Sequence, residues 1–326
     1  MSPSQRIAVA GGTGRIGLHI VESLLSLKST VPSLHIIVLS RSVKPEKSDI
    51  TFAGSSAPII AVDYNDTSGI ESILREHNID TVISALFGDV EVFDVAQQNV
   101  LTAALNVPTI RRFSPSELSV DSETADSVTI YVKKRPILQR LREVKAARSG
   151  SGSGSGVHFE YTKFVTGVIM NYLASGNPKS SGEDAHGHMF AHKLVFDFEN
   201  GTAEIPGDGQ ALLWTSRIQD MGEFIAHATQ LDVWPEQMDL VGDVRSMNEI
   251  RDLAEEILGK KLQVTYISEE TIQSKLDPSA TPLAKIGLEG RLSFGRGEMK
   301  RSETYAGLKD VVKPVGLEEF LRMWWG

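Results

Sequence analysis

The stretch AVAGGTGRIG, residues 8–17, decides the fold of this chain. The apolar run at residues 7–10 predicts a short strand, and the apolar spacing of residues 17–27 predicts a helix directly after the glycines. The glycines recur as G-x-x-G-x-x-G from Gly11 and as G-x-G-x-x-G from Gly12. Glycine permits a tight turn, a close approach of bare backbone to a pyrophosphate, and close packing of helix on sheet. Strand, turn and helix together predict a dinucleotide site at the helix N-terminus, rather than a glycine-rich turn without a ligand.

Strand-like and helix-like segments alternate through the rest of the first half. Further strands are predicted at residues 35–39, 59–62, 81–86 and 109–113, and helices at 68–77 and 92–105. Such alternation with short connections implies right-handed crossovers and a parallel sheet covered by helices on both faces. We therefore expect an α/β fold: a Rossmann-type doubly wound parallel sheet with a smaller C-terminal substrate-binding lobe.

The second half is less regular. We predict a basic helix at 131–147 containing Pro136, a strand at 158–162, a hairpin at 194–207 turning at Asn200-Gly201, a helix N-capped by Asp220, and a helix at 246–258 opened by a capping box. The Met-Trp-Trp sequence at residues 323–325 is expected to pack in the core.

The repeat SGSGSGSG, residues 149–156, marks a candidate domain boundary. Its composition is that of a flexible linker, but apolar residues resume directly after it, so we prefer a surface loop. We assign residues 1–156 to a cofactor-binding domain whose later strands come from 157–245, and residues 157–326 mainly to the smaller lobe.

Composition argues against several classes of function. The 326 residues include 33 Lys and Arg against 42 Asp and Glu, a formal net charge of −9, which disfavours a nucleic-acid partner. The chain has no cysteine, which excludes disulfides, thiolate catalysis and Cys-ligated metals. We see neither a signal-peptide pattern nor an apolar run of the roughly 18–20 residues that a membrane span needs. We expect a cytoplasmic monomer or homodimer that binds a small molecule and neither nucleic acid nor membrane.

The residues after the second strand discriminate between dinucleotides. An NAD enzyme usually has a carboxylate there for the ribose 2′-hydroxyl, whereas this chain has Arg41, followed by Lys44 and Lys47. A guanidinium suits a 2′-phosphate, so we predict NADP(H); the alternative is a solvated loop charge. Asp63, after the third strand, is placed either to accept from the adenine amine or to cap a turn.

Four motifs carry a family resemblance. VAGGTGRIG, the SRS around Arg41, RRFSPSEL at the fifth strand and the later Lys134 resemble the NmrA-like, isoflavone reductase-like group. This group, which includes phenylcoumaran benzylic ether reductase-like proteins, consists of atypical short-chain dehydrogenases/reductases. Its fifth-strand motif is similar to RFxPSEFG, and here Leu118-Ser119 replaces the final Phe-Gly. The resemblance extends to GDGQALLWTSRIQDMGEFI, residues 207–225.

The resemblance implies a catalytic lysine. Reductases of this group use a lysine in a Lys-x-x-[Ile/Val] setting as proton donor and ribose anchor, and Lys134 with Ile137 matches that setting. Partial desolvation beside a cationic nicotinamide would lower the lysine pKa and favour proton donation. By composition alone, residues 133–135 would be a solvated basic stretch. The Tyr-x-x-x-Lys signature of ordinary short-chain dehydrogenases does not lead to Lys134; Tyr131, three residues before it, is a weaker catalytic candidate.

The remaining site residues follow from these motifs. For the cofactor we predict contacts with Gly11, Thr13, Gly14, Arg15, Ile16, Arg41, Lys44, Asp63, Ser84, Ala85, Leu86, Phe113, Ser114, Pro115 and Lys134. For the substrate we predict Phe87, Ser116, Phe164 and Met170. Val168 and Tyr172 lie in the same stretch as Phe164 and Met170. We expect about half of these four residues to pack in the core. His186, His188 and His192 are enough histidines to bind a zinc ion. Their polar, glycine-rich stretch favours exposed histidines instead, so we expect no metal site.

The expected function is that of an NADPH-dependent reductase of a small aromatic or polycyclic, secondary-type metabolite. Hydride would leave nicotinamide C4 near residues 84–87 and 113–116, and Lys134 would protonate the developing anion. Two alternatives remain open at this point: a dinucleotide-sensing regulator that binds a protein partner, and a non-redox cyclase or isomerase that keeps NADP(H) as a scaffold.

Overall fold

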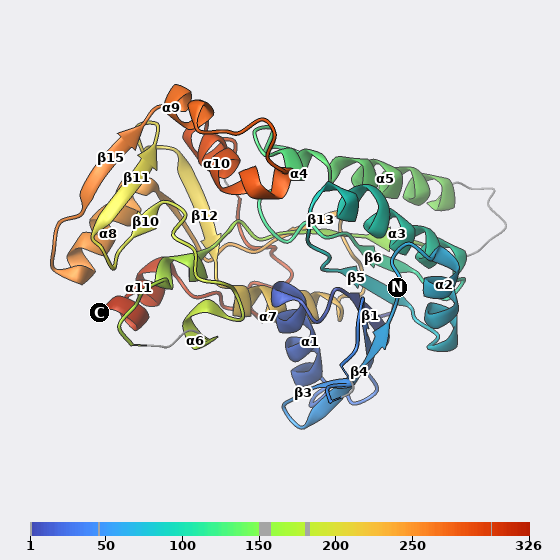
Figure 1. Cartoon of the computed structure of the whole chain (residues 1–326). Helices are drawn as coiled ribbons and strands as arrows, with labels where there is room; N and C mark the ends of the chain where they lie inside the picture. Colours follow the sequence, from blue (N-terminus) through green and yellow to red (C-terminus); the bar gives the residue numbers. More distant parts are fainter. Residues whose placement is uncertain (1, 45, 150–157, 180–182, 301) are drawn as a thin grey trace.

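A computed structural model describes residues 2–44, 46–149, 158–179, 183–300 and 302–326 (Figure 1). The last helix of the first half reaches residue 149, and the remainder of the Ser-Gly repeat, predicted as a surface loop, lies outside the described residues. Within the described part of the chain, no helix combines the length and apolar character needed to cross a lipid bilayer.

A seven-stranded sheet forms the larger lobe, in the order β3-β4-β2-β1-β5-β6-β7. Its strands are β1 (Arg6–Ala10), β2 (His35–Ser40), β3 (Asp49–Phe52), β4 (Ser55–Ala61), β5 (Thr81–Ser84), β6 (Arg112–Ser114) and β7 (Glu160–Tyr161). All neighbours pair parallel except β3 and β4, and Ile7 of β1 is in register with Ile36 on one side and Thr81 on the other. The predicted Rossmann-type parallel sheet is confirmed.

The edge hairpin β3–β4 was not predicted. Its two turn residues, Ala53 and Gly54, both have positive φ (49° and 74°), as a tight two-residue hairpin turn requires. Turns of this kind usually contain Asn-Gly or Asp-Gly, whereas this one contains Ala53-Gly54, so the sequence pattern did not predict it.

Helices cover both faces of the sheet. Alternate residues of β1 point to opposite sides, so Ile7 and Val9 pack under α1 (Arg15–Leu27) and α7 (Ile218–Ala228). Ala8 and Ala10 face α2 (Thr67–Glu76), α3 (Gln97–Asn106) and α5 (Arg135–Ser149). A π-helical turn, η1 (Val92–Ala96), leads into α3. The site therefore lies on a rigid three-layer support.

The predicted helix at 131–147 is divided in the structure. A four-residue helix, α4 (Thr129–Val132), ends before Lys133, and α5 begins afresh at Arg135. Pro136 stands in the first turn of α5, where the missing N–H of proline has no intrahelical partner to lose. The break matters because it places Lys134 between the two helices.

The C-terminal lobe lies at one end of the sheet (Figure 1). The remaining strands are β8 (Lys163–Val165), β9 (Val168–Ile169), β10 (Phe196–Asp197), β11 (Thr202–Pro206), β12 (Leu212–Ser216), β13 (Gln237–Asp239), β14 (Asp243–Ser246) and β15 (Gln263–Ile267), of which β8 and β13 pack in the core of the larger lobe through Phe164 and Met238. They pair as β10-β11-β15, β14-β12-β9 and β13-β8. The helices of the C-terminal lobe are η2 (Met170–Ala174), α6 (Glu183–His186), α8 (Met247–Leu258), α9 (Glu269–Ser274), α10 (Pro282–Gly295) and α11 (Leu317–Trp325).

Several local predictions for this half are confirmed. The β10–β11 hairpin turns through Gly201 (φ 66°), and Ser246 and Glu249 form the expected capping box at α8. The predicted core packing of residues 323–325 holds for the two tryptophans only: the Trp325 ring packs against Phe198 and the Trp324 ring against Phe320, whereas Met323 is exposed. The predicted N-cap at Asp220 is wrong: α7 begins two residues earlier, and the Asp220 carboxylate instead accepts from the Arg217 guanidinium and the Val315 N–H.

The boundary at residue 156 stays a prediction. Both β7 and α7 come after it in the chain, yet β7 completes the large sheet and α7 packs on α1. The larger lobe therefore draws part of its structure from residues beyond the Ser-Gly repeat.

Candidate active site

The turn between β1 and α1 needs its glycines for space. Gly11 has φ 75°, and a Cβ there would lie 2.9 Å from the Ala85 carbonyl oxygen. A Cβ at Gly17 would lie 2.2 Å from the Gly11 carbonyl oxygen. Gly14 is the N-cap of α1 and offers no capping side chain, and the first helical turn carries no acidic residue. The positive end of α1 is thus open to an anion.

Side chains beside the turn come from the ends of β1, β2 and β4. Thr13, Gly14 and Arg15 are exposed, Ile16 is half-buried, and the Thr13 hydroxyl lies 3.0 Å from the Ser40 hydroxyl. Arg41 is exposed directly after β2, and Lys44 is exposed three residues later. Both cations therefore lie in the stretch that follows β2.

Tyr64 braces the turn and was missed by the sequence analysis. Its hydroxyl donates to the Leu39 carbonyl at 2.9 Å and accepts from the Gly11 N–H at 3.0 Å. Burial raises the Tyr64 pKa to about 12, so the hydroxyl stays protonated and can make both bonds. In the sequence, only its position directly after the candidate residue Asp63 pointed to Tyr64. Asp63 itself is exposed and accepts from the Asn65 N–H at 2.9 Å, which is a turn contact; an adenine contact remains a prediction.

The loops after β5 and β6 are joined by Ser116, which a buried glutamine of α3 also contacts. The Gln97 side-chain oxygen accepts from the Ser116 N–H at 2.6 Å, and the Ser116 hydroxyl donates to the Leu86 carbonyl at 2.7 Å. Ser116 therefore holds the two loops together, although it was predicted to contact substrate. Within the described structure, the Ser84 hydroxyl and the Gln97 amide nitrogen are buried without a partner.

The predicted residues of these loops divide by exposure. The side chains of Ser84 and Leu86 are buried, Ala85 is half-buried, and Phe87 is 54% exposed at the rim. The four predicted residues of β6 and the loop after it are all buried: Phe113, Ser114, Pro115 and Ser116. Their backbone, rather than their side chains, is what they can offer a ligand.

Lys134 and Glu117 form the charged centre of the site. Lys134 is 4% exposed, and its Nζ donates to the Glu117 carbonyl oxygen at 2.7 Å. Burial lowers the Lys134 pKa, and attraction to the Glu117 carboxylate opposes that effect. Burial likewise raises the Glu117 pKa, against the attraction of Lys134. A lysine with a lowered pKa releases its proton more readily than an exposed one.

Tyr131 positions this lysine. The Lys134 Nζ lies 5.0 Å from the centre of the Tyr131 ring and 5.4 Å from that of Phe93. The Tyr131 hydroxyl is 2.8 Å from the Ser119 hydroxyl, and burial raises its pKa. Leu118, between Glu117 and Ser119, has φ 43°, an uncommon backbone conformation for a residue with a bulky side chain. This turn of the backbone follows directly after the Glu117 carbonyl that Lys134 contacts.

The predicted substrate residues of the second half have different surroundings. Phe164 is not brought to the site: it is fully buried, edge-on to Phe224 and Trp234, because β8 packs beneath α7. Met170 is also fully buried and lines an apolar cavity of about 30 Å³, which is far below the size of a ligand pocket. A larger hollow of about 410 Å³ lies at the far end of α1, away from the glycine turn.

Tyr172 is the better-placed aromatic residue of that stretch. Burial raises its pKa to about 12, and the nearby Arg15 guanidinium opposes that rise. Its ring lies 6.0 Å from that of Phe190, and the Arg15 guanidinium lies 4.4 Å from the centre of the Phe190 ring. Tyr172 and Phe190 thus connect the lysine centre with the glycine turn.

Comparisons with known proteins show what this chain is similar to. The model of the NmrA-like family matches residues 3–320. The oxidoreductase BOA1 of Botryotinia fuckeliana is 31% identical over 256 residues, 78% of this chain and 77% of that protein. The isoflavone reductase homolog A622-like of Nicotiana tabacum is 28% identical over 294 residues, 87% and 84% of the two chains. The leucoanthocyanidin reductase of Vitis vinifera, solved with NADPH, aligns over 98% of both chains with a TM-score of 0.70 and 20% identity, which shows a shared fold.

Proposed function

Since the chain belongs to the NmrA-like family, we propose that it is an NADPH-dependent reductase of a small aromatic or polycyclic secondary metabolite. The observation that carries the proposal is Lys134, a buried cation held at the carboxyl edge of the sheet. In open α/β sheets, ligands bind at this edge. The names of the relatives, an oxidoreductase and an isoflavone reductase homolog, support the reaction class.

The residues around the glycine turn fit NADP(H). The bare backbone of Gly11 and Gly14 and the uncapped start of α1 would bind the pyrophosphate. Arg41 and Lys44 would bind the 2′-phosphate, since both are exposed cations beside the turn. When bound, the dinucleotide supplies a hydride from its nicotinamide C4.

Lys134 would supply the proton. Reduction of a polarised double bond, or opening of a benzylic ether, places negative charge on a substrate oxygen or carbon. A buried ammonium with a lowered pKa is suited to neutralise that charge by transferring its proton. The Tyr131 ring and the Glu117 carbonyl orient the Lys134 side chain, so a proton leaves from one defined position.

Aromatic side chains favour an aromatic substrate. Phe87 is exposed in the loop after β5, and the Tyr172 ring lies against Phe190, which packs on Arg15 of the glycine turn. Flat ring systems would stack or pack edge-on against them, with a gain of about 0.5–1.5 kcal/mol per pair beyond burial.

The test follows NADPH consumption with candidate enones, imines, ketones and benzylic ethers. Lys134→Met should abolish turnover, because an apolar side chain of similar length cannot donate a proton, while NADPH binding should persist. The matched control is Lys133→Ala: Lys133 is the adjacent lysine, 44% exposed and 3.4 Å from Asp94, and its loss should leave turnover near that of the unaltered chain. Full turnover in Lys134→Met would contradict the assignment of the proton donor.

A further inference from the structure

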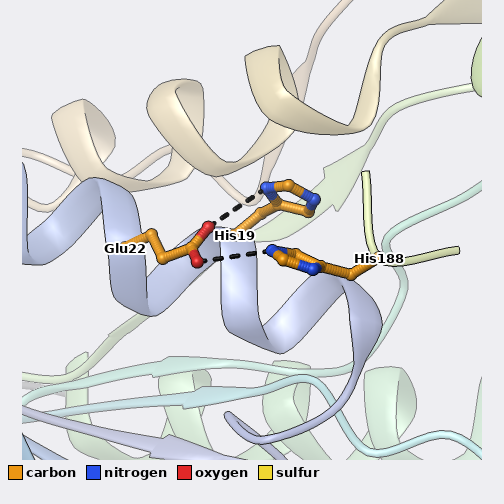
Figure 2. Close-up of side chains that lie close together, drawn as sticks. All are labelled: His19, Glu22 and His188. Carbon is orange, nitrogen blue, oxygen red and sulfur yellow. Dashed lines mark hydrogen bonds and ion pairs between the residues drawn. The ribbon is translucent and has the colours of Figure 1, made fainter. Parts of the chain in front are cut away.

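Three side chains of ligand type meet beside α1 (Figure 2). His19 and Glu22 lie one helical turn apart on α1, and His188 comes from the segment that follows α6. The His19 Nδ1 is 3.5 Å from one Glu22 carboxylate oxygen, and the His188 Nε2 is 3.3 Å from the other. The ligand atoms of all three residues lie within 4.8 Å of one another.

A hydrogen bond on the far side of the His19 ring fixes its tautomer. The His19 Nε2 is 2.7 Å from the Gly187 carbonyl oxygen, and a carbonyl only accepts, so Nε2 carries the proton. The Nδ1 of the neutral ring then presents a lone pair to a carboxylate that also only accepts. The His19 side chain is buried. A cation between the two acceptors would satisfy both.

The Gly187 backbone, which accepts this hydrogen bond, lies very close to His19 and to α7. Gly187 has φ 53°, and a Cβ on it would lie 2.9 Å from the His19 Nε2 and 2.5 Å from the Ile218 side chain. His188, the next residue, has φ 61°, which is uncommon outside glycine and turns its ring back toward Glu22. A carbonyl behind a metal-binding histidine is the usual outer partner that orients the ring.

The distances suit a tetrahedral ion. With bonds of about 2.0–2.1 Å to nitrogen and oxygen, neighbouring ligand atoms of tetrahedral zinc lie about 3.3 Å apart. The two nitrogen–oxygen distances at Glu22, 3.5 and 3.3 Å, are close to that value, although they run to different oxygens of the carboxylate, which would bind the ion through one oxygen or through both. Two imidazoles and one carboxylate favour Zn²⁺ over Mg²⁺ or Ca²⁺, which prefer oxygen. The nearby Arg217 guanidinium, which would repel an ion, is paired with Asp220.

We propose that His19, Glu22 and His188 bind one Zn²⁺ ion, with water as the fourth ligand, and that the ion ties the segment after α6 to α1. Of the three histidines considered from the sequence, His188 takes part, whereas the His192 ring packs against Tyr172 and Phe190. The tie has a consequence for the cofactor site, because Phe190 lies two residues after His188 and covers Arg15 beside the glycine turn.

The test titrates the full chain, without a histidine tag and after removal of metal with EDTA, with Zn²⁺ by calorimetry. We expect one ion per chain, and Glu22→Gln and His188→Ala should each weaken binding at least tenfold. The matched control is His192→Ala, a histidine of the same segment outside the cluster, which should bind as the unaltered chain does. Circular dichroism checks that each variant is folded. If His188→Ala is unfolded, the nearly isosteric Glu22→Gln alone decides the test.

Cobalt provides an independent readout. Co²⁺ in a tetrahedral site with nitrogen and oxygen ligands absorbs visible light strongly, so the unaltered chain should develop these bands and Glu22→Gln should not. Two results would overturn the proposal: no Zn²⁺ uptake by the unaltered chain, or equal affinities in Glu22→Gln, His188→Ala and the unaltered chain.

Discussion

At the scale of single residues, the cofactor preference depends on Arg41. Its guanidinium is exposed beside the glycine turn, where a 2′-phosphate of NADP(H) would lie. We predict that Arg41→Ala weakens NADPH binding about 10- to 100-fold, the effect of losing a charge-assisted contact, and leaves NADH binding almost unchanged. Fluorescence titration with each dinucleotide measures both constants. Equal losses for NADPH and NADH would show that Arg41 does not recognise the 2′-phosphate.

We expect Glu117 to influence the pKa of Lys134, the proposed proton donor. Its carboxylate opposes the lowering of the Lys134 pKa by burial, so Glu117→Gln should lower that pKa further. A general acid works only while protonated, so its rate falls as pH rises through its pKa. We predict that the alkaline fall of kcat/KM moves to lower pH in Glu117→Gln. A fall at unchanged or higher pH would mean that Glu117 does not control Lys134.

At the scale of elements, the β1–α1 junction depends on Gly17. A Cβ there would lie 2.2 Å from a backbone oxygen of the preceding turn, which cannot move without opening the junction. We predict that Gly17→Ala lowers the free energy of unfolding by about 1–3 kcal/mol and weakens NADPH binding. Urea denaturation measures the first effect and titration the second.

A second helical glycine provides the control for this substitution. A Cβ at Gly290 of α10 would meet a single atom, of the Phe294 ring, at 4.0 Å. Alanine favours a helix over glycine by up to about 1 kcal/mol, so Gly290→Ala should leave the chain as stable or more stable. Equal behaviour of the two variants would contradict the packing role of Gly17.

Elements with strong local signals could be predicted, and those set by tertiary contacts could not. The β1–turn–α1 unit and the Ser246–Glu249 capping box follow from glycine spacing and capping chemistry. The β3–β4 hairpin turns through an alanine, so it lacked a signal. The break before Lys134 depends on α4 and α5 packing separately, and Pro136 fitted either interpretation.

At the scale of the whole molecule, the same limit applies to the site. Lys134 was singled out by the family resemblance of its motif and Arg41 by its place directly after the second strand, and the roles of both stay predictions. Tyr64 and Gln97 act through hydrogen bonds to residues 53 and 19 positions away, which no local pattern reveals. Phe164 was misplaced because an apolar residue looks the same in sequence whether it faces a ligand or, as here, Trp234.

The central claim is that hydride passes from NADPH to a substrate at this edge of the sheet. Its most direct test incubates the protein with a substrate and NADPH carrying deuterium at the transferred C4 position, followed by mass spectrometry of the product. We predict one deuterium per product molecule with the unaltered chain and no product with Lys134→Met. Product that forms without deuterium and without NADPH oxidation would contradict the account and indicate a non-redox reaction.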